Sequence, residues 1–227
     1  MTPQLLFFII IGILIVDFVI DKYIDYLNAQ HFDDKIPDAL KDVYNEEEYY
    51  KSQSYKKENY RFSLFTSGFS ILLTLSFFIF KGFAWVDHFA RSFSDNEITI
   101  ALIFFGVIMI GSDIIQTPFA YYQNFVIEEK YGFNKSTKKL FLIDKLKGWL
   151  LSATIGGGVL AVILWFYQKT GDLFWVYTWI FIGVFTIFMT LFYSSLIVPI
   201  FNKQKTLEEG ELKRAIKDFS KKVGFKL

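Results

Sequence analysis

The sequence predicts an all-α, polytopic membrane protein with five transmembrane helices, its N-terminus outside and its C-terminus in the cytoplasm. Two observations lead to this fold class. First, 53% of the 227 residues are hydrophobic and 20% are aromatic, which is too apolar for an ordinary water-soluble domain. Second, 45 of the 47 charged residues lie outside five long apolar segments. Apolar stretches of about 18 residues or more are typical of helices that cross a bilayer.

The apolar segments place the spans in order along the chain, at residues 5–20, 62–80, 98–119, 148–168 and 173–200. The first is not a typical signal peptide, because residues 1–4 contain no Lys or Arg and no small-residue cleavage site follows. We therefore expect an uncleaved anchor. The last span is longer than a bilayer requires, so we expect it to tilt or to project into the cytoplasm.

The orientation follows from the positive charges of the connections, since cytoplasmic segments retain Lys and Arg during insertion. The first connection, the third connection and the tail together carry 21 of these residues, and the N-terminus and the other two connections carry 3. Residues 1–205 are accordingly read as a five-span membrane domain with cytoplasmic loops at 21–61 and 116–148. The sequence predicts an integral, multi-pass protein whose main partner is the lipid bilayer.

Composition also excludes several kinds of function. The net charge of +1 gives no reason to expect a nucleic-acid partner, and the absence of Cys excludes disulfides and thiolate metal sites. His31 and His88 fall on opposite sides of the predicted membrane, and no HExxH, GxSxG, GxxxxGK or GxGxxG motif occurs. We therefore expect no catalytic residue, cofactor site or metal site in this chain.

Two carboxylates lie inside the predicted spans. A charged side chain at mid-bilayer costs about 2.5 to 3.5 kcal/mol on insertion scales, although Asp17 and Asp113 both fall towards the cytoplasmic ends of their helices, where the cost is lower. Three interpretations stay open: pairing with Ser, Tyr or Lys between helices, a shared water-filled cavity, or a proton or ion relay. The glycines at 156–158 predict close helix approach or a local bend.

Two polar strings follow the third and fifth spans. In the first, FVIEEKYGFNKST at 125–137, a turn at Gly132 would create a rigid polar corner at the membrane surface. The second, PIFNKQKTLEEGEL, covers 199–212. The candidate functional residues of both strings, beside Asp17 and Asp113, are Glu128, Glu129, Asn134, Lys135, Phe201, Asn202 and Lys203.

The tail at 206–227 predicts an amphipathic helix that opens with a capping box of Thr206 and Glu209 and ends near Gly224. Apolar residues at 212, 216, 219 and 223 alternate with basic ones, so one face requires a cover. Packing against further protein and lying on anionic lipid are both open. We expect this helix to lead into further protein that is absent from this sequence.

At these strings the chain resembles the N-terminal membrane portion of type-1 CAAX prenyl proteases, which are integral-membrane zinc metalloendopeptidases. The matching residues are Phe125 to Lys135 and Thr137, Phe201 to Lys203, Leu207, Glu208 and Gly210 to Leu212, with support from Tyr50, Ser52, Tyr55, Pro118, Phe119 and Tyr122. The matches cover essentially the whole chain in order and spacing.

The resemblance implies that the helices enclose an intramembrane chamber and present a docking surface to a cytoplasm-facing metalloprotease domain, which would be the absent C-terminal catalytic domain. The candidate residues of the two strings, with Asp17 and Asp113, would then dock that domain or line the substrate chamber. Direct substrate contact and simple helix capping are the alternatives for the strings. In that family zinc is held by the two His of HExxH and a downstream Glu, and lipidated or membrane-bound polypeptides are cleaved. Zinc is thus expected in the missing domain, and this chain is predicted to be inactive alone. Two other functions stay open: a stand-alone transporter or channel module that uses Asp17 and Asp113, and a membrane scaffold for a partner protein.

Overall fold

The computed structural model describes residues 2–32, 35–36 and 45–225, and all regular structure in these ranges is helical. Five segments are long and apolar enough to cross a membrane, as the sequence predicted: Pro3–Ala29, Glu46–Ile79, Glu97–Tyr131, Lys138–Lys169 and Gly171–Phe201. The chain divides into two compact units, residues 1–165 and 166–227, which are taken separately below. The predicted membrane orientation of the termini stays a prediction.

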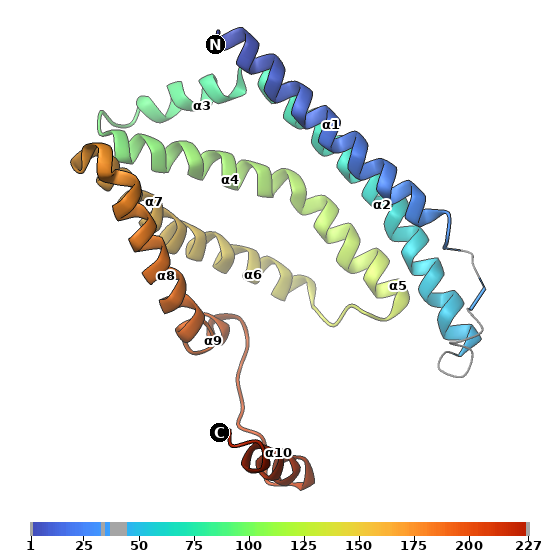
Figure 1. Cartoon of the computed structure of the whole chain (residues 1–227). Helices are drawn as coiled ribbons and strands as arrows, with labels where there is room; N and C mark the ends of the chain where they lie inside the picture. The colour runs from blue at the N-terminus through green and yellow to red at the C-terminus, as the bar shows by residue number, and fades with distance from the viewer. Residues whose placement is uncertain (1, 33–34, 37–44, 226–227) are drawn as a thin grey trace. The chain divides into compact units, whose positions relative to one another are not determined.

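The first two helices of unit 1, α1 (Pro3–Ala29) and α2 (Glu46–Ile79), lie side by side in Figure 1. They run antiparallel, because Phe7 near the start of α1 packs on Phe78 near the end of α2, with ring centroids 6.4 Å apart. Each helix begins at a polar cap. The Thr2 hydroxyl accepts a hydrogen bond from the backbone N–H of Leu5, and the Asn45 side chain accepts one from that of Glu47.

The chain then turns through α3 (Gly82–Arg91) into α4 (Glu97–Tyr122). Gly82 is needed at the start of α3, since a Cβ there would lie 2.5 Å from the Phe77 ring. Asn96 caps α4 by accepting from two backbone N–H groups, those of Ile98 and Thr99. The helix passes through Pro118 without ending.

Helical structure continues past α4 into the predicted loop 116–148. A π-helical turn, η2 (Gln123–Glu128), leads into the short α5 (Glu129–Tyr131), and only the next six residues, 132–137, separate it from α6 (Lys138–Leu151). Much of the predicted first loop, 21–61, is likewise an extension of α1 and α2. Apolar length therefore marked the spans correctly, whereas the helices themselves are longer.

The fourth span consists of α6, a second π-helical turn, η3 (Ser152–Gly156), and α7 (Gly157–Lys169). This irregular turn ends at Gly156, one of the three glycines for which the sequence predicted close helix approach or a local bend. Close helix approach is confined to one of them. A Cβ on Gly157 would meet Leu102 of α4 at 3.7 Å, an ordinary contact, and at Gly156 and Gly158 it would meet no described atom within 4 Å.

Unit 2 contains the end of α7, the turn η4 (Gly171–Leu173), α8 (Phe174–Leu196), α9 (Val198–Phe201) and α10 (Glu211–Lys222). Gly171 has φ +53°, a left-handed conformation that favours glycine. The chain reverses there, because the Phe166 ring lies 5.8 Å from that of Tyr177 and 6.1 Å from that of Phe181.

The predicted start of the tail helix was wrong. Residues 203–208 are not helical, and α10 begins at Glu211 behind an extended Gly210, so Thr206 and Glu209 form no capping box. The Glu209 carboxylate instead accepts from the ammonium of Lys213, in the first turn of α10, at 2.7 Å. The predicted end at Gly224 is correct. This residue has φ +73°, and the N–H of Phe225 donates to the carbonyl of Ser220.

Candidate functional site

The first polar string forms a hydrogen-bonded junction with α2, which we call the α2–α5 corner. It consists of Tyr55, Glu58 and Asn59 of α2 together with Gln123, Glu128, Lys130 and Tyr131 of η2 and α5. The three α2 residues follow helical i, i+3, i+4 spacing and therefore share one face of that helix. Because the corner joins residues from both basic connections, it places them at the same end of unit 1.

Glu128 lies at the centre of the corner. Its Oε1 accepts a hydrogen bond from the Tyr55 hydroxyl at 2.5 Å and from Gln123 Nε2 at 3.0 Å. The same Gln123 amide donates to Asn59 Oδ1 at 2.7 Å. The neighbouring Ile127 is 1% exposed, so the network sits against buried apolar surface. The side chain of Glu128 therefore holds two helical segments together.

Glu58 forms the second link of the corner. Its Oε2 accepts from the Lys130 ammonium at 2.7 Å and from the Tyr131 hydroxyl at 2.8 Å. The Tyr55 ring packs edge-on against Tyr131, at 5.1 Å between centroids, and against Phe133, at 5.0 Å. Aromatic pairs of this geometry contribute beyond the apolar area that they bury. The corner thus combines charge-assisted hydrogen bonds with ring packing.

The predicted turn at Gly132 is present, with φ +81°. The N–H groups of Phe133 and Asn134 both donate to the carbonyl of Glu128, at 2.8 and 3.2 Å. The Asn134 side chain donates to Glu129 Oε2 at 2.8 Å and accepts from the backbone N–H of Ser136 at the same distance. These bonds fix the exit from α5 and the direction in which the chain enters α6.

Substituting Gly132→Ala should destabilise the protein by about 1 kcal/mol, because a side chain is disfavoured at this positive φ. No described atom lies within 4 Å of the added Cβ, so the loss would come from the backbone and not from a clash. The matched control is Gly148→Ala inside α6, where the same change should be neutral or stabilising. Thermal unfolding in detergent measures both, and equal shifts would contradict the expectation.

The structure separates the predicted candidates of the first string into two groups. Glu128 is half-buried and bonded within the corner, and Asn134 is half-buried and bonded to Glu129 and Ser136. Glu129 and Lys135 are exposed. Phe133, which the sequence did not single out, is 59% exposed beside them. Glu58, Asn59 and Gln123 were also missed, because their partners lie 64 to 73 residues away.

The two intramembrane carboxylates have different surroundings. Asp113 of α4 accepts from the Lys145 ammonium at 2.8 and 2.9 Å, and from the Trp149 indole N–H at 2.8 Å. Both donors belong to α6, so this cluster is the interhelical pairing that the sequence left as one of three options. Asp17 is exposed on α1 and has no hydrogen-bond or ion-pair partner among the described residues. The structure does not bring the two carboxylates into one bonded cluster.

The second string lies in unit 2. Phe201 ends α9, and the N–H of Asn202 donates to the carbonyl of Val198 at 2.9 Å, after which Lys203 begins an exposed, non-helical segment. In α10 the apolar positions Leu212, Ile216, Phe219 and Val223 are all exposed. At the start of that helix, the ammonium of Lys213 and then that of Lys217 hold the pKa of the Glu209 carboxyl below its usual value.

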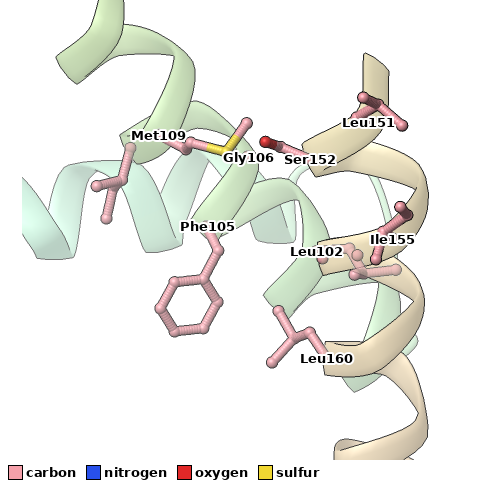
Figure 2. Close-up of a pocket in the computed structure, with 11 residues that line it drawn as sticks. Leu102, Phe105, Gly106, Met109, Leu151, Ser152, Ile155 and Leu160 are labelled. Carbon is pink, nitrogen blue, oxygen red and sulfur yellow. The ribbon is translucent and has the colours of Figure 1, made fainter. Parts of the chain in front are cut away.

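An apolar cavity of about 670 Å³ separates α4 from η3 and α7. Figure 2 shows Leu102, Phe105 and Met109 on one side, facing Leu151, Ile155 and Leu160, with the Ser152 hydroxyl as a polar group at the wall. None of its lining residues is charged. In the part of the chain that the structure describes, no three His, Asp or Glu side chains gather closely enough to hold a metal ion.

Comparison with known proteins identifies the family. The sequence model of the CAAX prenyl protease N-terminal family, described as having five membrane helices, matches residues 25–203. The chain belongs to this family. The structure has five long apolar helices among its described residues, the same number as the membrane helices in the description of the family. The protein is accordingly an integral, multi-pass membrane protein.

Individual relatives agree with this assignment. CAAX prenyl protease 1 of Saccharomyces cerevisiae is 32% identical over 96% of this chain and 51% of its own length, and the Arabidopsis thaliana homologue of CAAX prenyl protease 1 is 30% identical over 96% and 53%. The crystal structure of S. mikatae Ste24p is similar with a TM-score of 0.92 and 31% identity, over 98% of this chain and 53% of that one. This chain spans about half the length of the relatives that it matches.

Proposed function

We propose that this chain is the membrane-embedded N-terminal domain of a CAAX-type zinc metalloprotease. In this role it forms the intramembrane chamber and the docking surface for a cytoplasm-facing protease domain that cleaves prenylated or membrane-bound polypeptides. The observation that carries the proposal is the family match over 25–203, in a chain that covers only about half of each relative. The names of those relatives supply the substrate class.

The corner has a definite place in this proposal. Glu128 ties α5 to α2, and the turn at Gly132 then presents Glu129, Phe133 and Lys135 on an exposed surface. Exposed aromatic rings are enriched at protein interfaces, which favours Phe133 as a contact residue of this surface. We assign the domain-docking role to this exposed group, and to Phe201, Asn202 and Lys203 at the end of the last span.

The described residues of this chain do not fit a zinc site, because they lack a cluster of three possible ligands. In the proposal zinc and its ligands belong to the protease domain, and the metal would activate the water that attacks the peptide bond. The contribution of this chain is to hold a membrane-bound substrate in a protected space and to set the position of that domain.

Zinc analysis combined with a cleavage assay tests the proposal. We expect the protein made from the complete reading frame to bind zinc stoichiometrically and to cleave a farnesylated CaaX peptide, whereas residues 1–227 alone should do neither. Zinc and cleavage in the short form would overturn the assignment of the chemistry to the other half of the protein. Cleavage of unprenylated membrane peptides only would reassign the substrate.

The docking role is tested by a substitution in the same cleavage assay. Lys135→Glu in the complete protein should lower cleavage several-fold without lowering the unfolding temperature, because the side chain is exposed and makes no described contact. The matched control is Lys139→Glu, an exposed lysine at the second position of the neighbouring helix α6. Equal activity of the two variants would remove the first string from the docking surface.

The two alternative functions receive no support from a particular observation. Asp113, which a transporter would need as a relay group, is already bonded to a lysine and an indole, and Asp17 lies outside that cluster. The comparisons point to a protease family and not to a transporter or a scaffold.

A further inference from the structure

We propose that a groove between α2 and α4 binds one anionic phospholipid, with the Arg61 guanidinium on the phosphate and the aromatic wall of the groove around an acyl chain. The site goes beyond the proposed protease role and does not depend on it. It rests on three features of the structure: the shape of the groove, the charge at its rim, and the level of that rim along the span.

The groove has a volume of about 530 Å³, within the range of small-molecule sites. Phe62 and Phe65 of α2 form one wall, and Pro118, Phe119 and Tyr122 of α4 form the other. The wall is stiffened by ring contacts, since Phe62 stacks on Tyr122 at 5.1 Å and Phe65 meets Phe119 edge-on at 6.1 Å. Such a surface accepts a hydrocarbon chain with little loss of its own side-chain freedom.

The rim of the groove carries an unengaged cation. Arg61 is exposed and forms no hydrogen bond or salt bridge within the described ranges. The charge of Arg61 acts on the Glu58 carboxylate of the same rim, but that carboxylate already accepts hydrogen bonds from Lys130 and Tyr131. Arg61 and Lys130 carry two positive charges, whereas Glu58 carries one negative charge, so the rim has an excess positive charge. A guanidinium binds phosphate oxygens in pairs, which gives geometric specificity as well as energy.

The position of Arg61 supplies the reason for choosing a lipid. It immediately precedes the 19 uncharged residues of the second span, so it lies where that helix enters the bilayer. The phosphate groups of the leaflet occupy the same level, and basic pockets between membrane helices bind such head groups. From there the groove follows α2 inward past Phe65, which is 65% exposed. One lipid can therefore place its phosphate on Arg61 at the rim and an acyl chain along the aromatic wall.

The excess charge also predicts which head group is preferred. Phosphatidylcholine carries a quaternary ammonium that two neighbouring cations repel, whereas phosphatidylglycerol keeps a net negative charge. The larger cavity between α4 and α7 has no charged lining residue and predicts no such preference. The two sites therefore differ in the head group that they select. A preference for one head group tests the groove at Arg61, whereas lipid binding alone does not.

Native mass spectrometry on the delipidated protein from the complete reading frame is the test. Titration with phosphatidylglycerol should show one site that binds about tenfold more tightly than phosphatidylcholine with identical acyl chains, the size expected for a charge-assisted phosphate contact. Arg61→Ala should abolish the preference, and Arg61→Lys should retain part of it. The matched control is Lys51→Ala, which removes the same charge from an exposed site earlier on α2 and should leave binding unchanged.

The acyl chain is tested separately. Phe65→Ala should weaken both lipids several-fold, whereas Leu72→Ala, an equally exposed change on the same helix, should not. Soluble glycerophosphoglycerol, which has the head group without chains, should fail to compete. Unfolding temperatures of all variants show whether they fold. Any of four results would overturn the proposal. These are equal affinity for the two lipids, an unchanged preference in Arg61→Ala, competition by the soluble head group, and the absence of a site because a further part of the complete protein covers the groove.

Discussion

Replacing Asp113 by Ala should destabilise the protein by about 2 to 3 kcal/mol. The substitution leaves the Lys145 ammonium and the Trp149 indole N–H without their common acceptor, in a setting where α4 and α6 are both membrane helices. We keep the estimate below the 3 to 5 kcal/mol typical of fully buried pairs, because 35% of the Asp113 side chain and 19% of the Lys145 side chain are exposed. Unfolding in mixed detergent micelles gives the free energy.

The asymmetry of the cluster makes this prediction specific. Lys145→Ala should cost less than Asp113→Ala, since the carboxylate still accepts from Trp149 at 2.8 Å. Asp113→Asn should fall between them, because the amide oxygen keeps one bond and loses the charge. Asp17→Ala, at an exposed carboxylate without a described partner, is the matched control and should change stability by less than about 0.5 kcal/mol. If Asp113→Ala proved as mild as Asp17→Ala, the ion pair would have no structural role.

Much of the fold was predictable because the bilayer imposes a length on apolar segments. The helix ends were not, since no such rule stops a helix once it leaves the membrane. After the third apolar stretch, residues 120–131 remain helical, and residues 46–61 are helical before the second. The capping box at Thr206 failed for a related reason. The local pattern was adequate, but the extended Gly210 delays the start of the helix to Glu211.

The candidate site was predictable only where its cause was local. The turn at Gly132 depends on the conformational freedom of one residue, and it was found. The partners of Glu128 and Asp113 depend on the register between helices, which the sequence does not display. Lysine was foreseen as a class of partner for Asp113, but the choice of Lys145 required the structure. For the same reason, the sequence could not show that Glu128, a predicted docking residue, accepts a hydrogen bond from Tyr55 of α2.

Cysteine labelling should place residues 135 and 205 in the cytoplasm and residues 95 and 172 outside. The chain has no native Cys, so each site can be tested alone, and all four positions are exposed in the structure. With 21 of the 24 Lys and Arg residues in the connections assigned to the cytoplasm, we expect an all-or-none result with a membrane-impermeant maleimide on intact cells. Labelling of 135 and 205 should require permeabilisation, which serves as the control for accessibility.

The label at 205 carries the more demanding part of this prediction. The bonds from Tyr55 to Glu128 and from Glu58 to Lys130 already require the first and third connections to share a side, so a label at 135 reports on both. Residue 205 is separated from residue 135 by two long helices, Lys138–Lys169 and Gly171–Phe201. The two labels agree only if both helices cross the membrane or neither does, and the label at 172 separates those cases. Labelling of residues 135 and 205 on opposite sides would refute the five-span arrangement. It would also refute the proposal that a protease domain docks from the cytoplasmic side.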